Sequence, residues 1–300
     1  MLFEKQPVSS KEEENIQPVT TSLNRRTMIK RLGIAAATGT LALSISPALV
    51  LADNDNRSDD TSPRRKPSGF NVLLVHGAFA DASSWNQVIS LLQKEGHNVL
   101  AVQLPLTSLA DDVAVTQQAL ASATLTGPTV LAGHSYGGAV ITGAATGAAN
   151  AIGLVYASAF APAEGESLLD VSANAAPPQA ISHTIPSYRN GFAWIDPAYY
   201  PQAFAADVDP AQARVMAVTQ KPIAFKCFVE KSGPAAWQKL PSWYLVSKQD
   251  KEINPDLERF MANRIGATTI ELNSSHASPV VHPHAIAGLI EAAIKHYKKA

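Results

Sequence analysis

The chain has 300 residues and a mass of 31.7 kDa, of which 46% are hydrophobic and 16% charged. This composition supplies enough apolar material for a packed core and excludes wholesale disorder. Lys and Arg total 24 against 25 Asp and Glu, so no basic excess indicates binding to nucleic acid or to an anionic membrane surface. The single cysteine, Cys227, excludes an intrachain disulfide framework and a multi-cysteine metal site.

The first 52 residues have the pattern of a twin-arginine signal peptide. Arg25 and Arg26 are followed by a mildly apolar run over residues 32–52, which ends in small residues ahead of Asp53. We therefore expect a partner in the twin-arginine export machinery, cleavage before Asp53, a periplasmic or secreted protein, and no stable membrane association after cleavage. The alternative is an uncleaved membrane anchor, because the run is long enough to span a bilayer, although Pro47 weakens it.

Residues 53–68 alternate Asp, Asn, Ser, Arg and Pro and are predicted to form a disordered linker, with the folded domain covering residues 69–300. Within the domain, short apolar runs alternate with segments of helical periodicity. Strands are predicted at residues 70–75, 98–102, 129–132, 151–156, 243–247 and 268–272, and helices at 88–95, 111–123, 139–149, 255–265 and 283–297. This alternation predicts an α/β fold with a parallel sheet and helices on both faces.

The segment over residues 163–240 interrupts this alternation. It is rich in Pro, Ala and aromatic residues and shows no clear strand pattern. We predict a small cap insertion over the carboxyl edge of the sheet, where open α/β sheets bind ligands.

Residues 133–138 read Gly-His-Ser-Tyr-Gly-Gly and lie between a predicted strand and a predicted helix. The pattern Gly-x-Ser-x-Gly in this context predicts a sharp turn that presents Ser135 as a nucleophile, because glycines permit the strained backbone and the close strand–helix approach. The alternative is a purely structural glycine-rich turn.

A serine nucleophile needs a base, and the base needs a carboxylate to orient it. His276 follows the last predicted strand and is the expected base, whereas Asp250 follows the strand before it and is the expected acid. Glu252 is the alternative acid. We expect Asp207 and Asp209 to be solvated residues of the cap, and His76 and His134 to be structural, with His134 facing away from the pocket. His282 and His284 lie two residues apart and make an unlikely metal pair, so no metal site is predicted.

Two backbone N–H groups are expected to bind the oxyanion: that of Tyr136 at the helix start, and that of Ala78 in the loop after the first strand, with Phe79 as the second choice. Aromatic residues would form either the walls of the substrate pocket or ordinary cap core. They are Phe79, Phe160, Trp194, Tyr199, Phe204 and Trp237, of which Phe79, Phe160, Trp194 and Trp237 are the predicted substrate-binding residues.

These motifs resemble the α/β-hydrolase superfamily over residues 70–298, within the branch that holds bacterial EstC-like esterases, plant methylesterases and plant hydroxynitrile lyases. The matching positions are His76-Gly77-Ala78-Phe79, Trp85, residues 133–138, Asp250 and Ser275-His276. The resemblance implies a six-stranded parallel core, a small cap and no cofactor. The lyases carry Thr in place of Gly77 and Lys in place of Ala277, which favours ester hydrolysis.

The sequence thus predicts a serine carboxylic-ester hydrolase that forms an acyl-enzyme on small to medium, largely apolar esters. Lactone opening, perhydrolysis or carbon–carbon cleavage with the same triad stay open, as does a non-catalytic receptor for small ligands.

Overall fold

The computed structural model describes residues 70–178, 184–188 and 191–299. The predicted signal peptide and linker lie outside the described residues. Among the helices of the described part, none is long and apolar enough to cross a membrane.

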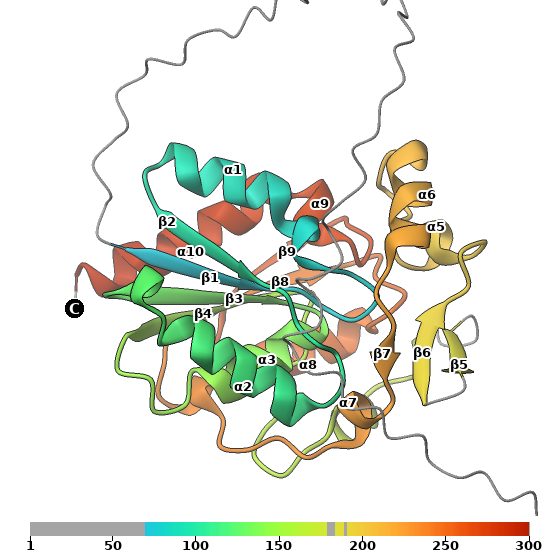
Figure 1. Ribbon diagram of the computed structural model, residues 1–300, viewed down its shortest axis with the longest axis horizontal. Coiled ribbons are helices and arrows are strands. Elements are labelled where there is room, and N and C mark those ends of the chain that lie inside the picture. Colours follow the sequence, from blue (N-terminus) through green and yellow to red (C-terminus); the bar gives the residue numbers. More distant parts are fainter. Residues whose placement is uncertain (1–69, 179–183, 189–190, 300) are drawn as a thin grey trace, which may run out of the picture. The chain divides into compact units, whose positions relative to one another are not determined.

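A six-stranded sheet forms the centre of the domain (Figure 1). Its strands run in the order β2-β1-β3-β4-β8-β9, and each neighbouring pair is parallel. They are β1 (Asn71–Val75), β2 (Asn98–Val102), β3 (Thr129–His134), β4 (Ala151–Ala157), β8 (Ser242–Ser247) and β9 (Thr268–Leu272). The predicted six-stranded parallel sheet is confirmed.

Alternation along the strands explains why helices cover both faces. In β1, Leu73 and Val75 face one hydrophobic cluster, whereas Val72 and Leu74 face the other. The first face is covered by α2 (Leu109–Leu120), α3 (Tyr136–Ala144) and α8 (Pro255–Arg264), and the second by α1 (Asn86–Lys94) and α10 (Pro283–Tyr297) (Figure 1). The short helix α9 (Ser278–Val281) leads into α10.

The helix predicted over residues 139–149 begins and ends earlier than expected. It starts at Tyr136, directly after the serine, and its last residue is Ala144. The chain then turns at Gly147, whose φ of +72° is a left-handed conformation that glycine adopts without steric cost.

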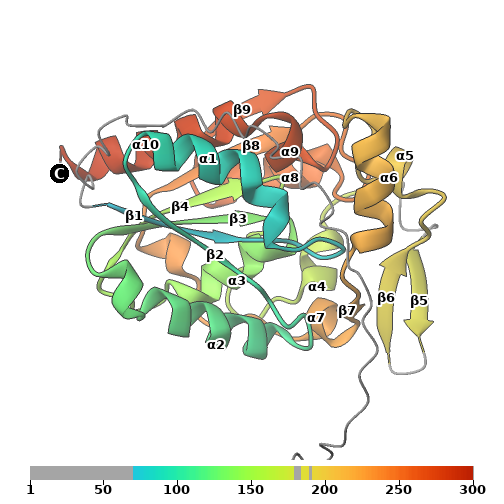
Figure 2. The same ribbon diagram turned by 45° about the horizontal axis from the view of Figure 1, so that its top comes forward.

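The cap is formed by the part of the chain that connects β4 to β8. It lies beyond the carboxyl ends of the sheet strands (Figure 2). It contains the antiparallel strands β5 (Thr184–Tyr188), β6 (Phe192–Ile195) and β7 (Ile223–Ala224) and the helices α4 (Leu168–Ser172), α5 (Tyr200–Ala203), α6 (Pro210–Thr219) and α7 (Lys226–Val229). The prediction of no strand in this segment was therefore wrong. Strand β7 has only two residues and Pro186 lies within β5, so these segments carry no clear alternating pattern in the sequence.

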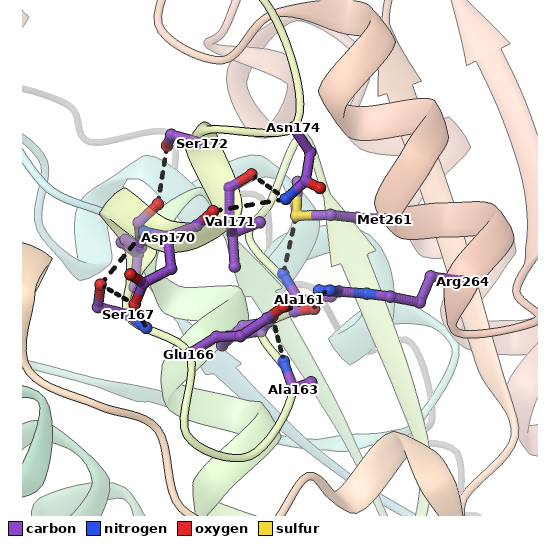
Figure 3. Close-up of polar contacts among 12 residues, drawn as sticks. Ala161, Ala163, Glu166, Ser167, Asp170, Val171, Ser172, Asn174, Met261 and Arg264 are labelled. Carbon is purple, nitrogen blue, oxygen red and sulfur yellow. Dashed lines mark hydrogen bonds and ion pairs between the residues drawn. The ribbon is translucent and has the colours of Figure 1, made fainter.

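Helix α8 contacts the segment that leads from β4 into the cap (Figure 3). Arg264 donates from Nη1 to both carboxylate oxygens of Glu166, each at 2.9 Å, and from Nη2 to the carbonyl of Ala161 at 2.6 Å. Beyond Glu166, Ser167 and Asp170 form a capping box at the start of α4. These contacts fix α4, which supplies part of the wall of the cavity described below.

Candidate active site

Ser135 occupies a strained turn between β3 and α3. Its φ of 55° and ψ of −124° lie in a region that non-glycine residues rarely adopt. A β-carbon at Gly133 would lie 2.5 Å from the carbonyl oxygen of Gly137, and one at Gly137 would collide with the carbonyl oxygens of Val75 and His76. The glycines of the motif are therefore required by close backbone approach, as the sequence pattern predicted.

Hydrogen bonds hold this turn in place. The N–H of Ser135 donates to Ala157 at the end of β4, and its carbonyl accepts from the N–H groups of Gly138 and Phe160, both at 3.0 Å. The phenol of Tyr136 donates to Asp112 Oδ2 at 2.6 Å. Asp112 is fully buried, and burial raises the pKa of its carboxyl. The backbone at Ser135 is thus held by β4 and the chain that follows it, and the side chain of Tyr136 is held by α2.

Asp250 and His276 are brought together by the ends of the neighbouring strands β8 and β9. His276 Nδ1 donates to Asp250 Oδ2 at 2.5 Å, and the second oxygen, Oδ1, accepts from the N–H groups of Glu252 and Ile253. Because the carboxylate only accepts, the proton lies on Nδ1, and Nε2 keeps a lone pair. Burial opposes the charged imidazolium, but Asp250 outweighs it through its charge and hydrogen bond, and the pKa of His276 is raised. Glu252, the alternative acid, does not bond to His276.

Glu258 lies behind Asp250 and was not identified from the sequence. It is fully buried, and Oε2 accepts from the N–H of Ser247 at 3.1 Å. Burial, followed by the charge of Asp250, raises the pKa of Glu258 well above its ordinary value. Its second oxygen, Oε1, is buried and makes no hydrogen bond to a described residue.

The cap holds the loop that carries His276. Asp207 accepts from the backbone N–H of Ser275 at 2.8 Å and also from the Ser275 hydroxyl, while the N–H of Ala277 donates to the carbonyl of Phe204. The ring of Phe204 packs edge-on against the imidazole, with centroids 4.7 Å apart. Asp207 is exposed, as expected of a solvated cap residue, but its contact with Ser275 was not predicted. Asp209 is exposed as well and caps the start of α6.

Ser135 and His276 line one cavity of about 240 Å³. Phe79 and Phe160 also line it, and their role in binding substrate stays a prediction. Trp194 and Trp237 are not among its lining residues, so their predicted place in the pocket wall is corrected. The indole of Trp237 instead donates to the carbonyl of Pro162 at 2.9 Å, and Trp194 packs against the larger hydrophobic cluster. Tyr199 and Phe204 are not lining residues either.

The loop after β1 brings backbone N–H groups to the same cavity. Ala78 and Phe79 both line it, and neither N–H donates to a described residue. His76 fixes this loop, because Nδ1 donates to the carbonyl of Gly77 and Nε2 accepts from the N–H of Leu104. Burial lowers the pKa of His76 to about 4, which keeps it neutral and structural. The N–H of Tyr136, the first residue of α3, has no partner within the helix.

His134 and His282 each contact a backbone carbonyl. His134 does not line the cavity, and its Nε2 donates to the carbonyl of His276 at 2.8 Å. His282 Nε2 contacts the carbonyl of Asn273. Within the described ranges, no group of three or more His, Cys, Asp or Glu side chains is arranged to hold a metal ion.

Comparison with known proteins agrees with this architecture. The model of a family described as the alpha/beta hydrolase family matches residues 72–289. A carbendazim hydrolyzing esterase from Nocardioides sp. (strain SG-4G) is 33% identical over 134 residues, which cover 40% of this chain and 54% of the relative. The aligned part thus spans about half the length of that curated relative.

Solved structures show the same fold at low sequence identity. A pyrethroid hydrolase from Sphingobium faniae JZ-2 superposes with a TM-score of 0.64 at 21% identity, over 74% of this chain and 96% of that structure. A methylesterase from Arabidopsis gives a TM-score of 0.64 at 15% identity, over 76% and 99% of the two chains.

Proposed function

The chain belongs to the alpha/beta hydrolase family, and we propose that it is a serine carboxylic-ester hydrolase that acts through an acyl-enzyme on small to medium, largely apolar esters. One observation carries the proposal. Ser135, on its strained turn, lines the same cavity as His276, whose Nδ1 is bonded to the buried carboxylate of Asp250. The names of the relatives, an esterase, a pyrethroid hydrolase and a methylesterase, support the same reaction class.

In the proposed mechanism, Ser135 Oγ attacks the ester carbonyl while His276 Nε2 accepts the hydroxyl proton. The N–H groups of Ala78 and Tyr136 donate to the oxyanion of the tetrahedral intermediate. When the carbon–oxygen bond breaks, His276 returns the proton to the leaving alcohol, and the acyl group stays on Ser135. A water molecule then attacks the acyl carbon and gives a proton to His276, which passes it to Ser135 as the carboxylic acid leaves. Asp250 stabilises the imidazolium in both halves of the reaction.

The walls of the cavity favour apolar substrates. Most lining side chains are hydrocarbon, and the cap supplies Leu168, Leu169, Phe225 and Phe228. Burying apolar surface of the substrate against them is the main source of binding free energy. A volume of about 240 Å³ suits an ester of modest size.

Gly77 favours hydrolysis over carbon–carbon cleavage. A β-carbon at this position would lie 2.7 Å from Ser135 Cβ and 3.0 Å from the carbonyl oxygen of His134. The threonine that hydroxynitrile lyases carry here would require the serine turn itself to shift. A lyase mechanism that depends on this side chain is therefore not proposed.

A substrate panel tests the proposed reaction. Purified protein is assayed on p-nitrophenyl esters of increasing acyl length, on matched lactones and on a cyanohydrin, with identification of the products. We expect stoichiometric acid and alcohol from the esters, and faster turnover of short and medium apolar acyl groups. Turnover of the lactone or cyanohydrin alone would reject ester hydrolysis as the main activity.

We further propose that the protein is exported by the twin-arginine route, because Arg25 and Arg26 precede the mildly apolar run. Expression of the whole chain in a bacterium with an intact pathway should yield periplasmic protein that begins near Asp53. The R25K/R26K variant should stay in the cytoplasm. Equal export of both forms would contradict the proposal.

A further inference from the structure

Glu252 lies in the wall of the catalytic cavity, and one oxygen of its carboxyl group has no hydrogen-bond partner among the described residues. Its side chain lines the cavity together with Ser135 and His276. Oε1 is buried and makes no hydrogen bond to any described residue. The position of the residue is well defined, because its backbone N–H donates to Asp250 Oδ1 at 2.7 Å.

Two other carboxyl groups near the site are fully paired, and a third, Glu258, also has an unpaired oxygen but lies outside the cavity. Both oxygens of Asp112 accept hydrogen bonds, and both oxygens of Asp250 do so as well. Glu258 is also buried, but it contacts Asp250 and the N–H of Ser247 and does not line the cavity. Buried polar groups are normally paired, and an unpaired one requires a reason. In Glu252 the unpaired oxygen belongs to a side chain that lines the substrate cavity.

We propose that Glu252 recognises a hydrogen-bond donor on the substrate, so that preferred esters carry a hydroxyl, N–H or ammonium group on an otherwise apolar body. This inference rests on the proposed esterase activity. The cavity wall is mostly hydrocarbon, and among the described lining residues Glu252 and His276 are the only ionisable side chains apart from the Tyr136 phenol, which is hydrogen-bonded to Asp112. Because His276 serves the reaction, Glu252 is the group left to orient the substrate.

The electrostatic surroundings of Glu252 suit this role. Burial and the charge of Asp250 raise the pKa of its carboxyl to about 7, partly offset by His276. Tyr200 is the other titratable group that interacts with it, and burial and Glu252 raise the pKa of that phenol. Near neutral pH the carboxyl is thus present in both forms. Either form accepts from a neutral donor, whereas the ionised form attracts an ammonium group more strongly.

Matched esters separate recognition from chemistry. One series consists of p-nitrophenyl 3-phenylpropanoates with a methyl, hydroxyl, ethyl or aminomethyl group on the acyl ring, and the second of benzyl acetates with the same groups on the alcohol. The methyl and hydroxyl esters form one pair of similar size, and the ethyl and aminomethyl esters form another. Values of kcat/KM are measured at pH 8 for the unaltered protein and for E252Q, E252M and E164Q. Glu164 is exposed on the cap and provides the control.

In at least one series, we expect the unaltered protein to prefer each donor ester over its apolar partner. E252M should lower that preference about tenfold or more for both pairs, because hydrogen bonds to a charged group are the stronger class. E252Q keeps an acceptor and should retain the hydroxyl preference while losing the ammonium preference. E164Q should change neither. Thermal melting of each variant checks that it is folded. If E252M fails to fold, the preference of E252Q for the aminomethyl ester over the ethyl ester tests the proposal instead.

Two negative outcomes remain distinct. Equal preference in the unaltered protein, E252Q and E252M, with all esters hydrolysed, would overturn the role of Glu252 and leave the esterase proposal standing. Absence of hydrolysis of every ester by the unaltered folded protein would overturn the esterase proposal itself.

Discussion

The serine turn and the cap border the same cavity, but their backbones are packed very differently. A β-carbon added at Gly133, Gly137 or Gly138 would lie less than 3.0 Å from backbone atoms. A β-carbon added in the cap, at Gly165, Gly191 or Gly233, would meet nothing within 4 Å. The cap also exposes apolar side chains, including Leu169 and Phe225, which line the cavity.

This difference suggests that the sheet edge determines catalysis and that the cap determines which substrates bind. The atoms proposed to react are placed by the ends of β3, β8 and β9, and the turn after β3 is packed closely against neighbouring backbone. Most of the apolar lining residues come from the cap, whose side chains are in part exposed. We therefore expect substitutions at the sheet edge to abolish catalysis and substitutions in the cap to alter which esters are accepted.

Replacement of Ser135 by Ala should give the largest effect. The variant lacks the proposed nucleophile, so kcat/KM for p-nitrophenyl esters should fall by roughly 10³-fold or more. Circular dichroism should show an unchanged fold. Activity within about tenfold of the unaltered protein would show that Ser135 is not the nucleophile.

Replacement of Gly137 by Ala should give the largest effect on stability, because the new methyl group collides with the carbonyls of Val75 and His76. Overpacking of this kind costs about 3 kcal/mol of unfolding free energy or prevents folding. Gly233→Ala is the matched cap substitution and should change stability by less than about 0.5 kcal/mol. Chemical denaturation measures both, and similar losses in the two variants would remove the contrast between turn and cap.

Asp207 belongs to the cap but is expected to affect catalysis, because it accepts hydrogen bonds from Ser275, the residue before His276. In Asp207→Ala we expect kcat to fall about tenfold, with little change in KM, because the imidazole is less well positioned. Asp209→Ala, which removes the cap of α6, should cost roughly 1 kcal/mol of stability and leave kcat unchanged. Equal kcat in the two variants would show that the loop holds its place without Asp207.

The smallest expected effect is a shift in pH dependence in Glu252→Gln. Burial lowers the pKa of His276, but Asp250 and then Glu252 raise it. Without the Glu252 charge, that pKa falls, so His276 stays a neutral base to lower pH. The acid limb of kcat/KM on an apolar ester should therefore move to lower pH. A limb that stays in place or moves to higher pH would mean that the Glu252 charge does not act on His276.

The sheet and the serine turn were predictable because each depends on local sequence. Buried parallel strands appear as continuous apolar runs. The glycines around Ser135 are required because a side chain there would collide with nearby backbone. Strand order also places Asp250 and His276 together once their strands are recognised. Even so, the predicted helix after Ser135 was three residues short at its start, because the turn itself has no helical periodicity.

The cap was harder to predict because it depends on tertiary contacts. Strand β7 has only two residues and pairs with β6, from which it is separated by α5 and α6. Asp207 lies 68 residues from its partner Ser275, so no spacing rule links them. The sequence around Trp194 and Trp237 does not indicate whether their side chains line the cavity or pack in the core of the cap. Glu258 could have been identified as an acidic residue at one of the buried positions of α8, but those positions are known only from the structure.

The most direct measurement of the central claim is the site of covalent capture. The protein is treated with a p-nitrophenyl alkylphosphonate, which transfers its phosphonyl group to an activated serine, and the modified peptide is mapped by mass spectrometry. We expect one phosphonyl group per chain, on Ser135, with loss of ester hydrolysis in proportion to labelling. Label on a different residue that tracks the loss of activity, or full activity after Ser135 is labelled, would contradict it.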